Sequence, residues 1–268
     1  EGAGNGAQPT GMLGQLTLTQ LELASQEGFS EGMELDHVEI DLHLGLAPFV
    51  LRLGRIWVDN PDVQVYASGH LAAKDDGWSV AIDGRVPSIN YEAIKRYWPS
   101  ELRPKMRRWM VNRVETARVE NGQFALRLEP GQALRRYADF EVHDAVIHYF
   151  ETLPSLYDMH GHVTVDNNRS VTDVHSGYMV PDGLGRIDFA GSRLTVDDIR
   201  IKPSVGRFDF RAQGDIVPML AGLDRPPMRA LSRANVPVEL GSGTGELTGW
   251  LEFPFKSQQC MMHHVAHR

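Results

Sequence analysis

Histidine is the residue type in this sequence with the clearest capacity for metal chemistry. His160 and His162 are separated by one glycine, and His143 and His148 lie in a neighbouring strand candidate. A zinc site needs a third protein ligand and further side chains that orient the ligands, and the spacing of these histidines identifies neither. We therefore predict satisfied or surface histidines and no metal site. His263, His264 and His267, near the C-terminus, could bind zinc or nickel incidentally.

Paired carboxylates are the other candidates for catalysis. Asp75-Asp76 and Asp197-Asp198 both lie where we expect turns, and aspartate in a turn commonly bonds its own backbone. Paired acid and base chemistry is therefore not predicted at either place.

Two glycine-rich stretches resemble parts of known catalytic motifs. Gly2 to Gly6 lacks the preceding strand of a dinucleotide loop, and Gly241 to Gly245 lacks the flanks of a nucleophile elbow. Since no catalytic constellation emerges, we predict that the chain is not an enzyme and uses no cofactor.

Composition limits the remaining classes. The 268 residues suffice for one large domain or two modest ones, and the net charge of −8 argues against a general nucleic-acid binder. Cys260 is the one cysteine, so an internal disulfide is excluded, which fits the cytosol or a periplasmic protein of this size. No run reaches the roughly 18 apolar residues of a membrane span. The chain starts at Glu1 without a methionine, and we interpret it as a piece of a longer protein, so the missing span says little about the parent.

The elements that must position any site are mostly strands. Apolar residues alternate repeatedly, and turn signals recur about every ten residues, which favours an all-β sandwich, barrel or open groove. Asp75-Asp76-Gly77 and Glu120-Asn121-Gly122 are predicted turns, and a helix is expected around Met228 to Arg233. Alternation places Phe124, Leu126 and Leu128 on one face of a strand, and it places Phe208 and Phe210 on one face of another strand. These five residues are the candidates for lining an apolar groove or a closed core.

One segment, Asn90 to Asn112, is helical in pattern, basic and aromatic. Apolar residues recur there at helical spacing, and Pro99 predicts two short helices with Asn90 and Ser100 as N-caps. In one interpretation Trp98, Met106, Trp109 and Met110 are core residues and the arginines are solvated. In the other, the helix lies near a membrane surface or an anionic lipid headgroup, for which arginine is well suited.

The pattern divides the chain into five sections. Residues 1–11 are expected to be a flexible end, 12–86 a first β section, 87–114 the helical segment and 115–255 a second β section. Residues 256–268 abandon the strand pattern, and we predict that they are a tail outside the core.

The helical segment resembles a known family. Its Tyr97-Trp98-Pro99, Pro104, Arg107-Arg108, Trp109 and Asn112 resemble a segment of the AsmA-like superfamily, with the YhdP-like branch, related to TamB, as the closest. Gly122 to Leu126, Leu153-Pro154, Gly206 to Leu220 and Gly243 to Pro254 follow in the family's order, so the resemblance covers Leu16 to Phe255. Glu115-Thr116 departs from the family, which tends to have glycines there.

The resemblance implies a mainly β fold: an elongated, curled antiparallel sheet that forms a taco-like groove, interrupted by two short helices. It implies a bacterial periplasmic protein anchored in the inner membrane by parts of the parent absent here. Its partners would be phospholipid acyl chains, conducted between the inner and outer membranes to maintain the outer membrane, with no catalysis and no nucleic acid.

Two other classes stay open. A scaffolding β module for envelope or outer-membrane protein assembly would have a closed, fully packed core. An enzyme or carbohydrate-binding sandwich would have convergent polar groups in a pocket. A lipid conduit would instead have a continuous apolar groove.

Overall fold

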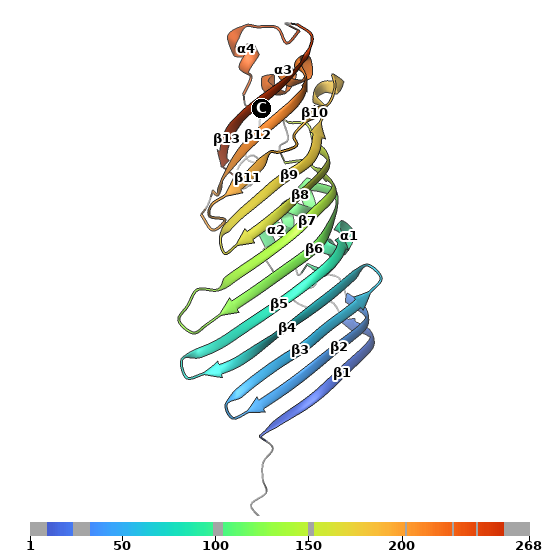
Figure 1. The fold of residues 1–268 in the computed structure, drawn as a ribbon, viewed down its shortest axis with the longest axis vertical. Helices are drawn as coiled ribbons and strands as arrows, with labels where there is room; N and C mark the ends of the chain where they lie inside the picture. Colours follow the sequence, from blue (N-terminus) through green and yellow to red (C-terminus); the bar gives the residue numbers. More distant parts are fainter. Residues whose placement is uncertain are drawn as a thin grey trace, which may run out of the picture. The chain divides into compact units, whose positions relative to one another are not determined.

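Strands dominate the computed structural model, which describes residues 10–23, 33–98, 104–149, 153–201, 203–226, 228–239 and 241–254. Within these residues thirteen strands form an antiparallel sheet, and the helices are few and short (Figure 1). The predicted mainly β, antiparallel class with a two-helix interruption is therefore confirmed. No described helix has the length and apolar character needed to cross a membrane.

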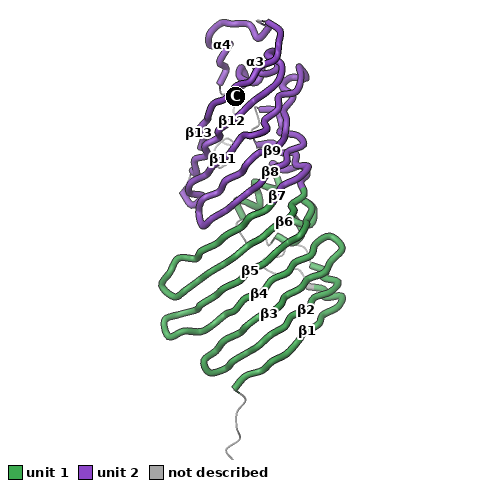
Figure 2. Tube along the Cα trace, viewed as in Figure 1, with its two compact units in different colours: residues 1–112, 118–140 green, residues 113–117, 141–268 purple. Residues whose placement is uncertain are grey.

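The chain divides into two compact units (Figure 2). Unit 1 comprises residues 1–112 and 118–140, and unit 2 comprises residues 113–117 and 141–268. Strands β6 (Val114–Leu128) and β7 (Arg135–Ile147) contribute residues to both units.

Unit 1 is a meander in which each strand pairs with the next one along the chain. Its strands are β1 (Gly11–Leu23), β2 (Met33–Leu46), β3 (Phe49–Asn60), β4 (Val63–Lys74) and β5 (Gly77–Asn90), followed by β6. The helices α1 (Tyr91–Tyr97) and α2 (Pro104–Arg113) lie between β5 and β6 in sequence. The predicted turn at Asp75-Asp76-Gly77 is confirmed, with Gly77 at a φ of 144° that favours glycine.

Unit 2 continues with β8 (Leu156–Asp166) and β9 (Arg169–Met179), then β10 (Ile187–Asp188), β11 (Arg193–Val196), β12 (Val205–Asp215) and β13 (Thr244–Pro254). Both β10 and β11 pair with β9 and with β12, and β13 pairs with β12. The short elements are η1 (Pro181–Gly183), α3 (Ile216–Asp224) and α4 (Ala230–Ala234). Thus α4 lies close to the helix expected around Met228 to Arg233, whereas α3 was not predicted.

Only unit 2 contains a cluster of buried apolar side chains among the described residues. Ala145, Leu156, Met159, Val174 and Met179 form this cluster, and half-buried aromatic and aliphatic residues pack against it. This is the ordinary core of a small β protein, in which apolar surface is removed from water.

The predicted turn at Glu120-Asn121-Gly122 is wrong. All three residues lie inside β6, where Glu120 pairs with Ser88 and Gly122 with Val86. Asn121 has a φ of 54°, a left-handed conformation that asparagine tolerates better than most residues. The Asn-Gly sequence therefore marks a local distortion of a continuous strand.

Candidate functional site

Unit 1 presents one apolar face that runs across six strands. Residues directly opposite one another in a sheet point to the same side, so the strand register defines this face. Its first row is Met12, Leu44, Leu51, Leu71, Val80 and Leu128. Its second row is Gly14, Leu42, Leu53, Gly69, Ile82 and Leu126. Its third row is Leu16, Ile40, Ile56, Ala67, Gly84 and Phe124. We call these three rows the apolar face of unit 1.

Very little of this face is buried. Gly84 is its only buried member, Met12 and Leu16 are 54% and 40% exposed, and the other residues are half-buried. The strands of unit 1 form a single layer in Figure 1. The candidates Phe124, Leu126 and Leu128 therefore share a face, as predicted, and the described residues do not enclose that face in a packed core.

The opposite side of the same strands is largely polar. Arg55 bonds Glu39 at 2.9 Å and Asp41 at 3.1 Å, and Arg127 bonds Asp83 at 2.7 Å. Trp57 and Tyr66 stack on this side, with ring centroids 6.3 Å apart. The two sides of the sheet thus differ sharply in chemistry, which is the pattern of an antiparallel sheet with one face in water.

Phe208 and Phe210 occupy a similar position in unit 2. They share one side of β12, with ring centroids 6.1 Å apart, and Leu194 and Leu251 are the cross-strand neighbours of Phe208. The intervening Asp209 points to the other side, where the Arg207 guanidinium bonds it at 2.9 Å and lowers the pKa of its carboxyl. Each candidate set therefore lies on an apolar face within its own unit.

Helix α1 begins at the predicted N-cap. The side chain of Asn90 accepts a hydrogen bond from the amide of Ala93 at 2.8 Å, which satisfies one free donor of the first turn. The second predicted N-cap, Ser100, and the predicted break, Pro99, lie outside the described residues.

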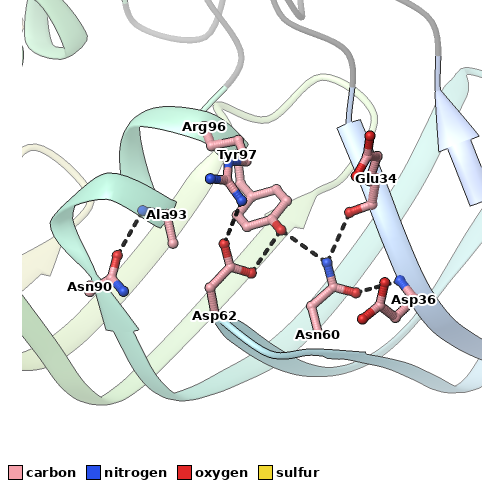
Figure 3. Close-up of polar contacts among 8 residues, drawn as sticks. All are labelled: Glu34, Asp36, Asn60, Asp62, Asn90, Ala93, Arg96 and Tyr97. Atoms are coloured by element: carbon pink, nitrogen blue, oxygen red, sulfur yellow. Dashed lines mark hydrogen bonds and ion pairs between the residues drawn. The ribbon is translucent and has the colours of Figure 1, made fainter.

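Tyr97 connects the end of α1 to the turn between β3 and β4 (Figure 3). Its hydroxyl donates to Asp62 at 2.9 Å and accepts from Asn60 at 2.9 Å, and Arg96 bonds the same carboxylate at 2.8 Å. Asn60 is buried and also bonds backbone groups of β2, donating to the carbonyl of Glu34. Burial raises the pKa of the Tyr97 phenol. Tyr97, a residue of the family segment, therefore holds α1 against the strand ends.

Hydrogen bonds attach helix α2 to helix α1 and to Trp98 at the end of α1. Arg107 donates to the carbonyls of Trp98 and Lys95 at 3.1 and 3.2 Å, and the Tyr91 hydroxyl donates to the carbonyl of Met110 at 3.2 Å. These contacts explain why an arginine of the family segment lies half-buried.

The interpretation of α2 as a core helix is wrong. Trp109 is 42% exposed and Met106 is 53% exposed, and none of the described residues of α2 is buried. Pro104, Lys105, Arg108 and Asn112 are exposed as well. Helical spacing identified a common side for the aromatic and sulfur-containing residues, but on that side Met106 and Trp109 are exposed and Met110 is half-buried.

The structure brings two of the four strand histidines together. His143 and His160 come together, with their Nδ1 atoms 3.2 Å apart, whereas His148 bonds Glu115 at 3.0 Å. Two carboxylates that the sequence did not single out, Asp144 and Asp158, lie beside His160. Their positions depend on the pairing of β7 with β8, so histidine spacing alone could not have identified them.

A comparison with protein-family models identifies the family, while neither curated proteins nor solved structures produced a match. The model described as YhdP protein matches residues 5–230, which is most of the chain and includes the helical segment, the apolar face of unit 1 and the strand that carries Phe208 and Phe210. The predicted relationship to the YhdP-like branch is thereby confirmed over these residues, and the chain belongs to the YhdP protein family.

Proposed function

We propose that the apolar face of unit 1 binds phospholipid acyl chains, with Phe124, Leu126 and Leu128 among its contacts. The observation that carries this proposal is a wide apolar surface, three residues deep on each of six strands, which no packed core among the described residues encloses. A contiguous apolar surface that stays accessible to solvent is uncommon on soluble proteins and marks binding of apolar partners. Acyl chains suit it because they need only apolar contact and no directional bonds.

Phe208 and Phe210 are proposed to serve the same purpose in unit 2. Their side of β12 and β13 carries Leu247 and Leu251, and the other side carries charged pairs such as Arg211 with Glu246 at 2.9 Å. A two-sided sheet of this kind separates a lipid path from water without any catalytic group.

The outward side of α2 is consistent with a lipid partner. Lys105 and Arg108 flank Trp109 there, and the helix contains no acidic residue. Tryptophan and basic side chains together are typical of surfaces that meet lipid headgroups.

From family membership we further propose a bacterial periplasmic location, with an inner-membrane anchor in parts of the parent protein. There the protein would conduct phospholipid between the inner and outer membranes. The alternative is a scaffolding module for envelope assembly, in which the apolar faces would contact protein.

The test compares two variants of unit 1, each with one added negative charge, on opposite sides of the sheet. Leu126→Glu introduces a carboxylate into the apolar face, and the control Gln123→Glu introduces one on the opposite side, across from Arg85. Phe210→Glu tests unit 2, because an ionised carboxylate is strongly disfavoured among acyl chains.

Native mass spectrometry and crosslinking to photoreactive phospholipid provide the readouts, and circular dichroism monitors folding. We expect Leu126→Glu and Phe210→Glu to lose bound lipid while remaining folded, and Gln123→Glu to retain it. A wild-type protein that neither carries phospholipid nor crosslinks to it would exclude the conduit and favour the scaffold. Unfolding of Leu126→Glu would instead identify the apolar face as a closed core.

A further inference from the structure

Two aspartates and a histidine converge on neighbouring strands of unit 2. His160 on β8 has its Nε2 atom 3.2 Å from Asp158 Oδ1 on the same strand and 3.6 Å from Asp144 Oδ1 on β7. One ligand atom from each residue lies within 4.8 Å of the others. The carboxylates are 57% and 58% exposed and the imidazole 32%, so the cluster is open to ions and water.

Two of the three separations are close to the edges of a metal coordination tetrahedron, and the third, between the two carboxylates, is at most 4.8 Å. Zinc–nitrogen and zinc–oxygen bonds of about 2.0–2.2 Å place adjacent ligands of a tetrahedral site roughly 3.3–3.6 Å apart. The two distances from His160 Nε2, 3.2 Å to Asp158 and 3.6 Å to Asp144, are close to this spacing.

A chain of hydrogen bonds orients His160. Its Nδ1 lies 3.2 Å from Nδ1 of His143, and Nε2 of His143 lies 3.2 Å from Glu141 Oε2. A His143 that donates from Nε2 to Glu141 must accept at Nδ1, so we assign the proton between the rings to His160. The lone pair of His160 Nε2 then faces both aspartates. A metal-binding histidine commonly donates its other ring proton to an orienting acceptor in this manner.

The backbone at both carboxylates is unusual. Asp144 and Asp158 have φ values of 53° and 49°, although both lie inside strands. Left-handed residues within strands interrupt the alternation of side chains, and such conformations concentrate at binding sites. Here they accompany two carboxylates that lie beside the same imidazole.

We propose that Asp144, Asp158 and His160 bind a divalent transition-metal ion, with zinc the best match to one nitrogen and two oxygen ligands. His143 and Glu141 are positioning residues. The ion joins β7 to β8, and water completes its coordination. Without a metal, a protonated His160 that donates to Asp158 accounts for the same distances, so the experiment must separate the two states.

The experiment uses the full chain with His263, His264 and His267 replaced by glutamine, which removes incidental binding near the C-terminus. Zinc chloride alone is titrated into this protein after treatment with a chelator, and calorimetry gives stoichiometry and affinity. We expect one equivalent to bind, and Asp158→Asn and His160→Gln to weaken binding at least tenfold. His143→Gln should weaken it about 10- to 100-fold without changing the stoichiometry, as for an orienting residue. The control His175→Gln alters an exposed histidine of β9 and should bind normally.

Thermal unfolding provides the second readout, because a ligand that binds only the folded state raises the melting temperature. Zinc should raise the melting temperature of the parent protein and not that of Asp158→Asn. The proposal is overturned by the absence of saturable zinc binding, or by equal binding in Asp158→Asn. If Asp158→Asn lowers the melting temperature equally with and without zinc, the cluster is a metal-free ion pair. None of these outcomes depends on lipid binding.

Discussion

Phe124 lies with its ring against Gly84, its cross-strand neighbour in unit 1. A Cβ atom at Gly84 would be only 2.1 Å from Cζ of Phe124, so the ring occupies the space that any other residue would need. The same arrangement recurs in unit 2, where a Cβ at Gly249 would be 2.8 Å from Cζ of Phe210. In both units an aromatic ring therefore covers a glycine. Glycine weakens a strand because it has no side chain to pack, and the ring packs over the backbone at that position.

Gly84→Ala should therefore destabilise unit 1. The added methyl group displaces the Phe124 ring, and overpacking of this kind typically lowers the free energy of unfolding by about 1–3 kcal/mol. The φ of Gly84 is not in the left-handed region, so the effect comes from the contact and not from backbone strain. Chemical denaturation of the single variant measures it.

A double-mutant cycle with Phe124→Ala provides the control. Because the two residues are in contact, their effects should not add, and Gly84→Ala should be nearly neutral when Phe124 is absent. Equal effects of Gly84→Ala in both backgrounds would show that the ring does not lie on the glycine.

Features that depend on the local pattern of one strand were predicted from the sequence, and features that depend on the pairing of distant strands were not. Alternation placed Phe124, Leu126 and Leu128 on one face because the period of a strand is fixed by its own backbone. The partner of Phe124 could not be predicted, because the register joins strands distant in sequence. For the same reason the sequence did not predict that Asp144 and Asp158 lie together. Their proximity depends on strand pairing and on the left-handed conformation of both residues.

The helical segment shows a different limitation. Helical spacing and Asn90 predicted α1 correctly, since an N-cap acts within one turn. Spacing also identified a shared side for Met106 and Trp109, but periodicity cannot tell what covers that side. Apolar periodicity usually implies burial, and α2 departs from this rule.

Trp109→Ala should accordingly have little effect on stability. The side chain is 42% exposed and α2 buries no residue, so we expect a loss below about 1 kcal/mol. Tyr91→Ala in the same segment is the matched comparison, since Tyr91 is 6% exposed and should lose about 3–5 kcal/mol as a buried aromatic. Similar losses for both variants, measured by denaturant unfolding, would restore the core interpretation of Trp109.

Tyr97→Phe should loosen α1 from the strand ends. The variant removes the bond to Asp62 and leaves one amide proton of the buried Asn60 without its acceptor, at a loss of about 1–3 kcal/mol. Hydrogen exchange of the α1 amides should accelerate in parallel. Tyr157→Phe, at a 37% exposed tyrosine of unit 2, is the control and should leave these amides unchanged. Unaltered protection in Tyr97→Phe would mean that other contacts hold the helix.

Alkaline pH should destabilise unit 2 through Tyr149. Burial raises the pKa of its phenol far above the ordinary value near 10, and its hydroxyl donates to Sδ of Met179 at 3.2 Å. Above about pH 10 the unfolded chain loses this proton while the folded chain keeps it. The unfolded state then binds fewer protons, so the free energy of unfolding falls as pH rises. The stabilisation contributed by the protonated Tyr149 phenol is complete below about pH 10 and is lost progressively above it.

Denaturant unfolding at pH 8, 9, 10 and 11 tests this linkage. In Tyr149→Phe the free energy of unfolding should fall less steeply above pH 10 than in the wild type. It should still fall, because burial also raises the pKa of Tyr91 and Tyr97. Tyr157→Phe, at a 37% exposed tyrosine of the same unit, controls for the removal of a tyrosine hydroxyl as such. The same steepness in Tyr149→Phe would show that the Tyr149 phenol is reached by water and ionises in the folded protein.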